Sequence, residues 1–143
     1  MAQSGKHSSS ESQPATASQL ARLAEQSQID FEVDFFGKIL ETHPEFVDVL
    51  RAHASNLTLK GRYADGLGFD KRLVQLRPTD PLAHYNLACS YALLKRRDQA
   101  LKTLRRAVEL GYRDFRYMRE DRDLDAIRQD PRFRQLLRDY ESR

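Results

Sequence analysis

The sequence predicts an all-α fold, specifically an α-solenoid of antiparallel helix pairs. Apolar residues recur at spacings of three and four along most of the chain, which is the period of an amphipathic helix. A period of 34 residues relates successive parts of the chain, and short alternating strand patterns are absent from the sequence. These three observations together favour stacked helical repeats.

The composition indicates one soluble domain behind a disordered tail. The chain has 143 residues, 40% hydrophobic and 31% charged, which is enough for one hydrophobic core. Residues 1–18 are mostly Ser, Gln, Thr and Ala, so we expect a disordered tail followed by a single domain at 19–143. We find neither a membrane span nor a signal peptide, and the lone Cys89 suits a reducing compartment, so we expect a cytoplasmic protein.

Charge is unevenly distributed along the chain. Residues 1–44 carry three Lys or Arg against six Asp or Glu, whereas residues 95–143 carry fifteen against ten. The basic C-terminal third could attract nucleic acid, but its arginines alternate with acids at spacings that form local ion pairs. We therefore disfavour nucleic acid as the partner. The basic stretch Arg96, Arg97, Arg105 and Arg106 stays open as an alternative binding surface.

The first predicted helix precedes Pro44. Its apolar stripe has three-and-four spacing and consists of Phe31, Phe35, Phe36, Ile39 and Leu40. Proline cannot continue a helix, so we expect this helix to end near Pro44. We interpret residues 19–46 as a degenerate N-terminal repeat, present as either a helix pair or a single helix.

Two fuller repeats follow, at about 47–80 and 81–114. Shifting the sequence by 34 residues superposes small on small and apolar on apolar positions, such as Ala54 on Ala88 and Leu57 on Tyr91. In the second repeat Asp80 is a predicted N-cap, and Gly111 is a predicted C-terminal cap. The small residues Ala88, Ala100 and Ala107 would let two helices pack closely.

A helical cap is predicted at about 115–141. Asp130 can cap a helix whose first residue is Pro131, and its apolar stripe consists of Phe133, Leu136, Leu137 and Tyr140. Such a segment covers the last exposed hydrophobic face of a repeat array.

The stretch "HYNLACSYALLKRRDQALKTLRRAVEL" resembles the tetratricopeptide repeat, TPR. The resemblance rests on His84-x2-Leu87-Ala88-x2-Tyr91 followed by Ala100-x3-Leu104-x2-Ala107 at a 34-residue period. Residues 47–80 match less well. The resemblance implies a short protein of the bacterial type with a C-terminal helical cap, acting as a scaffold or adaptor that binds a peptide of another protein in its concave groove.

The same resemblance assigns candidate partner-binding residues to the first helix of each pair and to the cap: Arg51, Ser55, Leu59, Tyr85, Asn86, Cys89 and Arg116. We expect Tyr85 to form an apolar wall, Asn86 to bond to the peptide backbone, and Arg51 to select an acidic segment. Arg51, Asn86 and Arg116 lie at sites comparable to those with which some relatives hold a C-terminal carboxylate, although Ser55 and Glu120 depart from that pattern.

The sequence offers no catalytic or metal-binding motif. It has no His-Glu-x-x-His run, no Cys pair and no glycine-rich phosphate loop. His53 and His84 fall at packing positions. The run "REDRDLD" holds four acids, but its arginines favour a self-neutralising turn over a calcium loop, which would need regular oxygen spacing and a glycine. We therefore predict a protein that is not an enzyme and has no cofactor, with another protein as partner and self-assembly into a homo-oligomer as an alternative.

Overall fold

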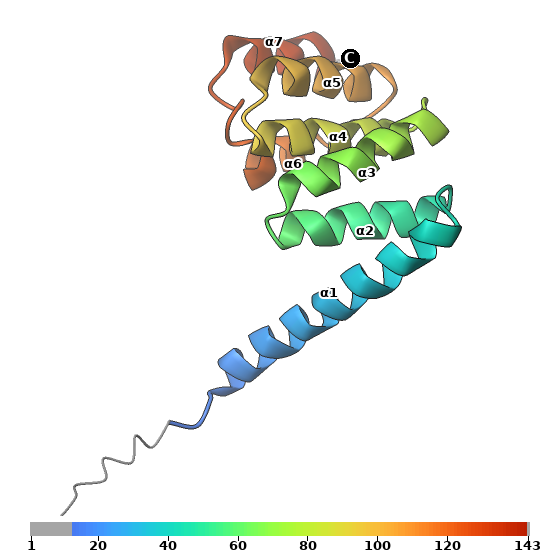
Figure 1. Cartoon of the computed structure of the whole chain (residues 1–143). Helices are drawn as coiled ribbons and strands as arrows, with labels where there is room; N and C mark the ends of the chain where they lie inside the picture. The colour runs from blue at the N-terminus through green and yellow to red at the C-terminus, as the bar shows by residue number, and fades with distance from the viewer. Residues whose placement is uncertain (1–12, 143) are drawn as a thin grey trace, which may run out of the picture.

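The computed structural model describes residues 13–142, which form seven α-helices, one 3₁₀ helix and no strand. Residues 1–12 of the predicted tail lie outside the described range. The helices stack into an elongated array, from which the first helix extends away on its own (Figure 1). The all-α solenoid expected from the sequence is confirmed. No described helix combines the length and apolarity needed to cross a bilayer.

Helix α1 (Ala17–Thr42) is a single long helix and not a helix pair. Thr16 caps its N-terminus in a capping box with Gln19, so the last two residues of the predicted tail are helical. The helix ends before Pro44 as predicted. Its apolar stripe, however, is divided: Phe36, Ile39 and Leu40 pack against the array, whereas Phe31 and Phe35 are exposed.

Two antiparallel helix pairs follow, α2 (Val47–Leu59) with α3 (Tyr63–Leu76) and α4 (Pro81–Leu93) with α5 (Arg97–Glu109). Asp80 caps α4 through the backbone N–H groups of its first turn, as the sequence indicated. The turn inside each pair needs a residue with positive φ. Gly61 supplies it in the first pair (φ 76°), and Lys95, 34 residues later, supplies it in the second (φ 61°). The 34-residue period therefore persists in the backbone conformation, although the second pair has a lysine where the first has a glycine.

Small residues allow the helices to approach closely. Ala88, Ala100 and Ala107 are fully buried at the packing of α4 against α5. In the first pair the equivalent of Ala100 is Gly66, where an added Cβ would lie 3.4 Å from the Ala54 carbonyl oxygen. Steric room, and not helix propensity, therefore explains these small residues.

The C-terminal cap folds back over the last helix pair. It consists of α6 (Phe115–Glu120), the 3₁₀ helix η1 (Arg122–Leu124) and α7 (Pro131–Tyr140). Asp130 caps α7 ahead of Pro131 as predicted. The apolar faces of these elements complete the main core, to which they contribute Phe115, Met118, Leu124, Ile127, Phe133, Leu136 and Leu137.

The two histidines assigned to packing positions are buried. The His53 ring lies edge-on to Phe69 with ring centroids 4.7 Å apart, and burial lowers its pKa. His84 Nε2 lies 2.8 Å from the Pro78 carbonyl oxygen. Both rings thus serve the packing of the helix pairs.

Candidate functional site

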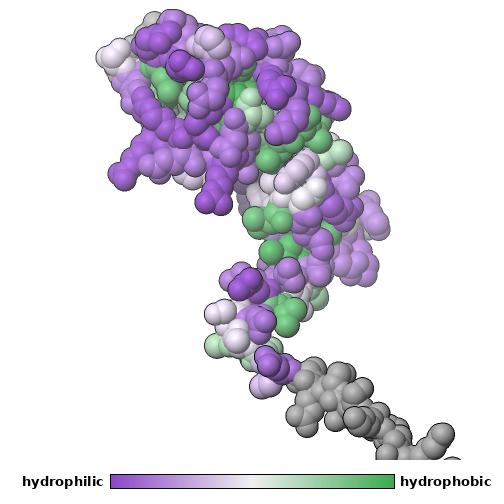
Figure 2. All heavy atoms as spheres, turned by 90° about the vertical axis from the view of Figure 1, so that its left-hand side faces the viewer, coloured by the Kyte–Doolittle hydropathy of each residue, from purple (hydrophilic) through white to green (hydrophobic). Residues whose placement is uncertain are grey.

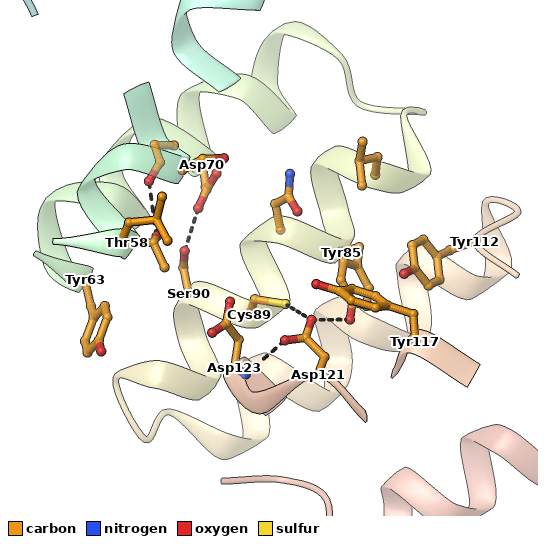
Figure 3. A pocket seen from close by; sticks show the side chains of 15 residues that line it. Thr58, Tyr63, Asp70, Tyr85, Cys89, Ser90, Tyr112, Tyr117, Asp121 and Asp123 are labelled. Carbon is orange, nitrogen blue, oxygen red and sulfur yellow. Dashed lines mark hydrogen bonds between the residues drawn. The ribbon is translucent and has the colours of Figure 1, made fainter. Parts of the chain in front are cut away.

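A groove of about 530 Å³ runs along the concave side of the array, between α2, α4 and the cap. The first helices of the two pairs line it, and the segment from Tyr112 to Asp123 closes its far end. Figure 3 shows the side chains that face it. Their common feature is a mixture of tyrosines, carboxylates and small polar groups.

Helix α4 forms the floor of the groove. Tyr85 and Cys89, and likewise Asn86 and Ser90, lie one above the other because positions four apart share a face of a helix, and the two adjacent rows both line the groove. Asn86 is half-buried, while the other three are buried. The floor is therefore a preformed surface whose polar atoms are held in place.

Asp121 is the hub of the hydrogen bonds at the cap end of the groove. Its carboxylate accepts from the Tyr85 hydroxyl at 2.6 Å, from the backbone N–H of Asp123 at 3.0 Å and, at 3.7 Å, from the Cys89 thiol (Figure 3). Asp121 also begins η1 as its N-cap. These contacts tie the cap to α4 and fix a buried carboxylate beside the floor.

Three tyrosines stand around this carboxylate. The rings of Tyr85 and Tyr112 are stacked with centroids 4.1 Å apart, and the Tyr117 ring lies 6.3 Å from that of Tyr85. Tyr117 is 52% exposed. The cluster thus has a stacked inner pair and one exposed ring.

Asp70 of α3 supplies a second buried carboxylate near the other end of the groove. It accepts a hydrogen bond of 2.5 Å from the Ser90 hydroxyl. Burial raises the pKa of this carboxyl from 3.8 to about 6. Asp70 is therefore ionised at neutral pH, but at a cost in free energy.

The electrostatic character of the groove is negative. The residues that line it include Asp70, Asp121 and Asp123 and no Lys, Arg or His. Burial raises the pKa of Tyr112 to about 12 and raises that of Cys89, with the nearby carboxylates acting in the same direction. The carboxylate of Asp121 raises the pKa of Tyr117. A protein with net charge +3 thus carries an acidic groove.

Five of the seven residues predicted to bind a partner line this groove: Ser55, Leu59, Tyr85, Asn86 and Cys89. Arg51 and Arg116 do not. The Arg51 guanidinium pairs with Asp80 at 2.7 Å and supports the cap of α4. Arg116 is exposed on α6 and lies 3.9 Å from Glu120. Both guanidinium groups thus have their ionic partners outside the groove.

Sequence reasoning missed the acidic and aromatic half of the groove, namely Tyr63, Asp70, Tyr112, Tyr117, Asp121 and Asp123. Asp121 and Asp123 belong to a run that was interpreted as a self-neutralising turn. One available signal was the spacing Asp121-x-Asp123 at the start of a short helical turn. An Asp that caps such a turn has its carboxylate held in place by a backbone N–H group of that turn.

Cys89, Asp121 and Asp123 also bring a sulfur and two carboxylate oxygens within 4.8 Å of one another. The Asp121 carboxylate is already an acceptor of the hydrogen bonds described above, and burial disfavours the Cys89 thiolate by raising its pKa. The cluster therefore has the properties of a hydrogen-bonding network.

Stacked antiparallel helix pairs with a helical cap and a concave groove define a TPR-like helical solenoid. No family model matches the chain. A solved structure, the MamA RS-1 ArsTM double mutant, superposes with a TM-score of 0.58 over 85% of this chain and 72% of that chain, at 21% identity. This likeness shows a shared fold.

A curated relative is a chloroplastic protein of Arabidopsis thaliana. It is 32% identical over 84 residues, which are 57% of this chain and 25% of the relative. The chain thus matches about a quarter of the length of that protein.

Proposed function

We propose that the protein is a non-catalytic scaffold that binds an extended, positively charged segment of a partner protein in the concave groove. The observation that carries the proposal is the acidic, tyrosine-lined groove itself. Its negative charge is complementary to Lys or Arg side chains. The acidic segment favoured by the sequence relied on Arg51, and the carboxylate clamp relied on Arg51, Asn86 and Arg116. Both arginines lie outside the groove lining.

The three tyrosines suit a cationic side chain. A guanidinium or ammonium group at the exposed ring of Tyr117 would gain from the ring face and from the carboxylate of Asp123, which is half-buried. Asn86 offers an amide on the floor to the peptide backbone, and Leu59, 71% exposed, offers apolar contact at the opposite end. The groove thus combines charge, aromatic and backbone recognition.

The chemistry of the groove supports a binding role over a catalytic one. Its candidate nucleophile, Cys89, is held as the thiol because burial raises its pKa. His53 and His84 are packed into the helix pairs and do not line the groove. The groove lining therefore contains no cysteine–histidine or serine–histidine pair.

The arginines of α5 already have partners within the protein, which weakens the alternative of nucleic-acid binding. Arg105 pairs with Asp139 at 3.2 Å and Arg106 with Glu109 at 3.4 Å. The Nε of Arg97 donates to the Ala126 carbonyl at 3.1 Å. Phosphate contacts would have to compete with these interactions.

The test is fluorescence anisotropy with labelled peptides of about ten residues that differ only in Lys and Arg against Glu. We expect the basic peptide to bind, and Asp123→Asn to weaken it about tenfold, since a charge-assisted hydrogen bond contributes about 1.5 to 3 kcal/mol. Glu120→Gln, which removes the same charge from an exposed site outside the groove, is the matched control. Preference for the acidic peptide would refute the proposed charge selection.

Two further outcomes separate the alternatives. Binding of the acidic peptide that survives Asp123→Asn and Tyr117→Ala but is lost on replacing Arg105 and Arg106 would move the site to α5. Binding of RNA that falls steeply with salt, in the absence of any peptide binding, would favour the nucleic-acid interpretation.

A further inference from the structure

Helix α1 carries an apolar face that nothing in the described chain covers. Leu20, Leu23, Phe31 and Phe35 are 57%, 58%, 62% and 48% exposed. The rings of Phe31 and Phe35 stack on each other with centroids 5.7 Å apart. In Figure 2 apolar residues are visible along the stem that leads from the body of the protein toward the N-terminus.

This face lies opposite the one that packs on the array. At 3.6 residues per turn, one side of the helix carries Leu20, Ala24, Ser27, Phe31 and Phe35. Phe36 and Leu40, which pack against α2, lie on the opposite side. A surface helix needs one apolar face, and α1 has two.

The first half of α1 also lacks the packing that usually stabilises a helix. Residues 17–28 are all exposed, and a helical segment of about 12 residues is marginal in water without tertiary contacts. A partner that packs against the second apolar face of α1 would supply these contacts.

We propose that this packing partner is α1 of a second copy of the chain, and that the two helices pair antiparallel about a two-fold axis near Ser27. In this register Leu20 faces Phe35 of the second copy, and Ala24 faces Phe31 of the second copy. Each phenylalanine thus meets a smaller side chain, and the small Ser27 lies at the crossing. A parallel pair would place Phe31 on Phe31 and Ala24 on Ala24, which no single separation of the helix axes fits.

The size of the face predicts a reversible dimer. Roughly 100 Å² is exposed on each of the four large side chains, so the pair would cover about 800 Å² before flanking residues are counted. Specific stable interfaces start at about 1,200 Å², and smaller ones are weak. None of these residues lines the groove, so this inference does not rest on the proposed function.

The test is sedimentation equilibrium of the full chain from about 5 to 500 μM. We expect the mass to rise from 16.6 kDa toward twice that value, and Phe31→Glu to weaken association at least tenfold. The control is Phe46→Glu, the same change at a phenylalanine that is 50% exposed but not on α1. A monomer at every concentration, or equal effects of the two variants, overturns the proposal.

Cysteine cross-linking in a Cys89→Ser background tests the register. Ser27→Cys should form an intermolecular disulfide, because the two copies meet at the axis. Ala24→Cys should not, because the antiparallel register separates its two copies by about 10 Å along the helices, beyond the Cα separation of about 7 Å that a disulfide spans. Efficient linking of both variants indicates a parallel pair and overturns the antiparallel one.

Discussion

The ionised carboxylate of Asp70 should destabilise the folded protein near neutral pH, and Asp70→Asn should relieve this cost. The side chain is 4% exposed, and burial raises its pKa from 3.8 to about 6. Between these values the folded chain binds more protons than the unfolded chain. Its stability therefore falls as the pH rises from about 4 through 6.

The expected size follows from the shift. About two pKa units at about 1.4 kcal/mol each give about 3 kcal/mol for the ionised group at pH 7. Asparagine has nearly the same shape, can accept the same hydrogen bond from Ser90, and never ionises. The variant should therefore be up to about 3 kcal/mol more stable than the native chain at pH 7, and nearly equal to it at pH 4.

Urea unfolding followed by circular dichroism at pH 4 to 8 measures this difference. The control is Asp65→Asn in the same helix, where the carboxylate is 55% exposed and pairs with Arg62, so that the same change in net charge should cost a few tenths of a kcal/mol. Burial lowers the pKa of His53, so this residue also makes stability depend on pH, but it is common to both proteins and cancels in the difference. A gain for Asp70→Asn that does not vary with pH, or no gain, would refute the reasoning.

Three further substitutions test the packing and the hydrogen bonds by the same unfolding assay. Ala88→Leu should cost about 1 to 3 kcal/mol, because the fully buried alanine leaves no room between α4 and α5; unchanged stability would mean that the helices are not close. Arg51→Ala should cost about 1 kcal/mol through loss of the half-buried pair with Asp80, yet leave peptide affinity unchanged. Tyr85→Phe should cost about 1 to 3 kcal/mol by depriving buried Asp121 of a donor, and a neutral effect would argue against that bond.

The helix pairs could be predicted from the sequence because their signals are local or periodic. Asp80 caps α4 through its own neighbours, and the 34-residue period places Ala88 and Ala100 in equivalent close contacts. Which apolar residues of α1 would be buried could not be predicted. Periodicity identifies an apolar face, but it does not say whether the chain itself supplies a partner, and for Phe31 and Phe35 it does not.

The acidic half of the groove escaped prediction because charge neutralisation depends on where each side chain points. The run from Arg119 to Asp125 holds two arginines and four acids, and the sequence does not show which acids the arginines pair with. In the folded protein Arg119 pairs with Glu141, and Arg128 pairs with Asp125. The carboxylates of Asp121 and Asp123 are left facing α4 without a cation in the groove.

The cap contributes two kinds of side chain, apolar residues in the core and carboxylates in the groove, that the sequence could not separate. Its apolar residues, such as Met118 and Leu124, close the core and are sufficient for that purpose. Its carboxylates add nothing to apolar burial, and burial raises the pKa of Asp123, as it does that of Asp70. Polar groups kept at a cost in stability are typical of sites selected for binding. This cost falls on carboxylates that line the concave side, and it is a physical reason for placing the proposed binding site in the groove.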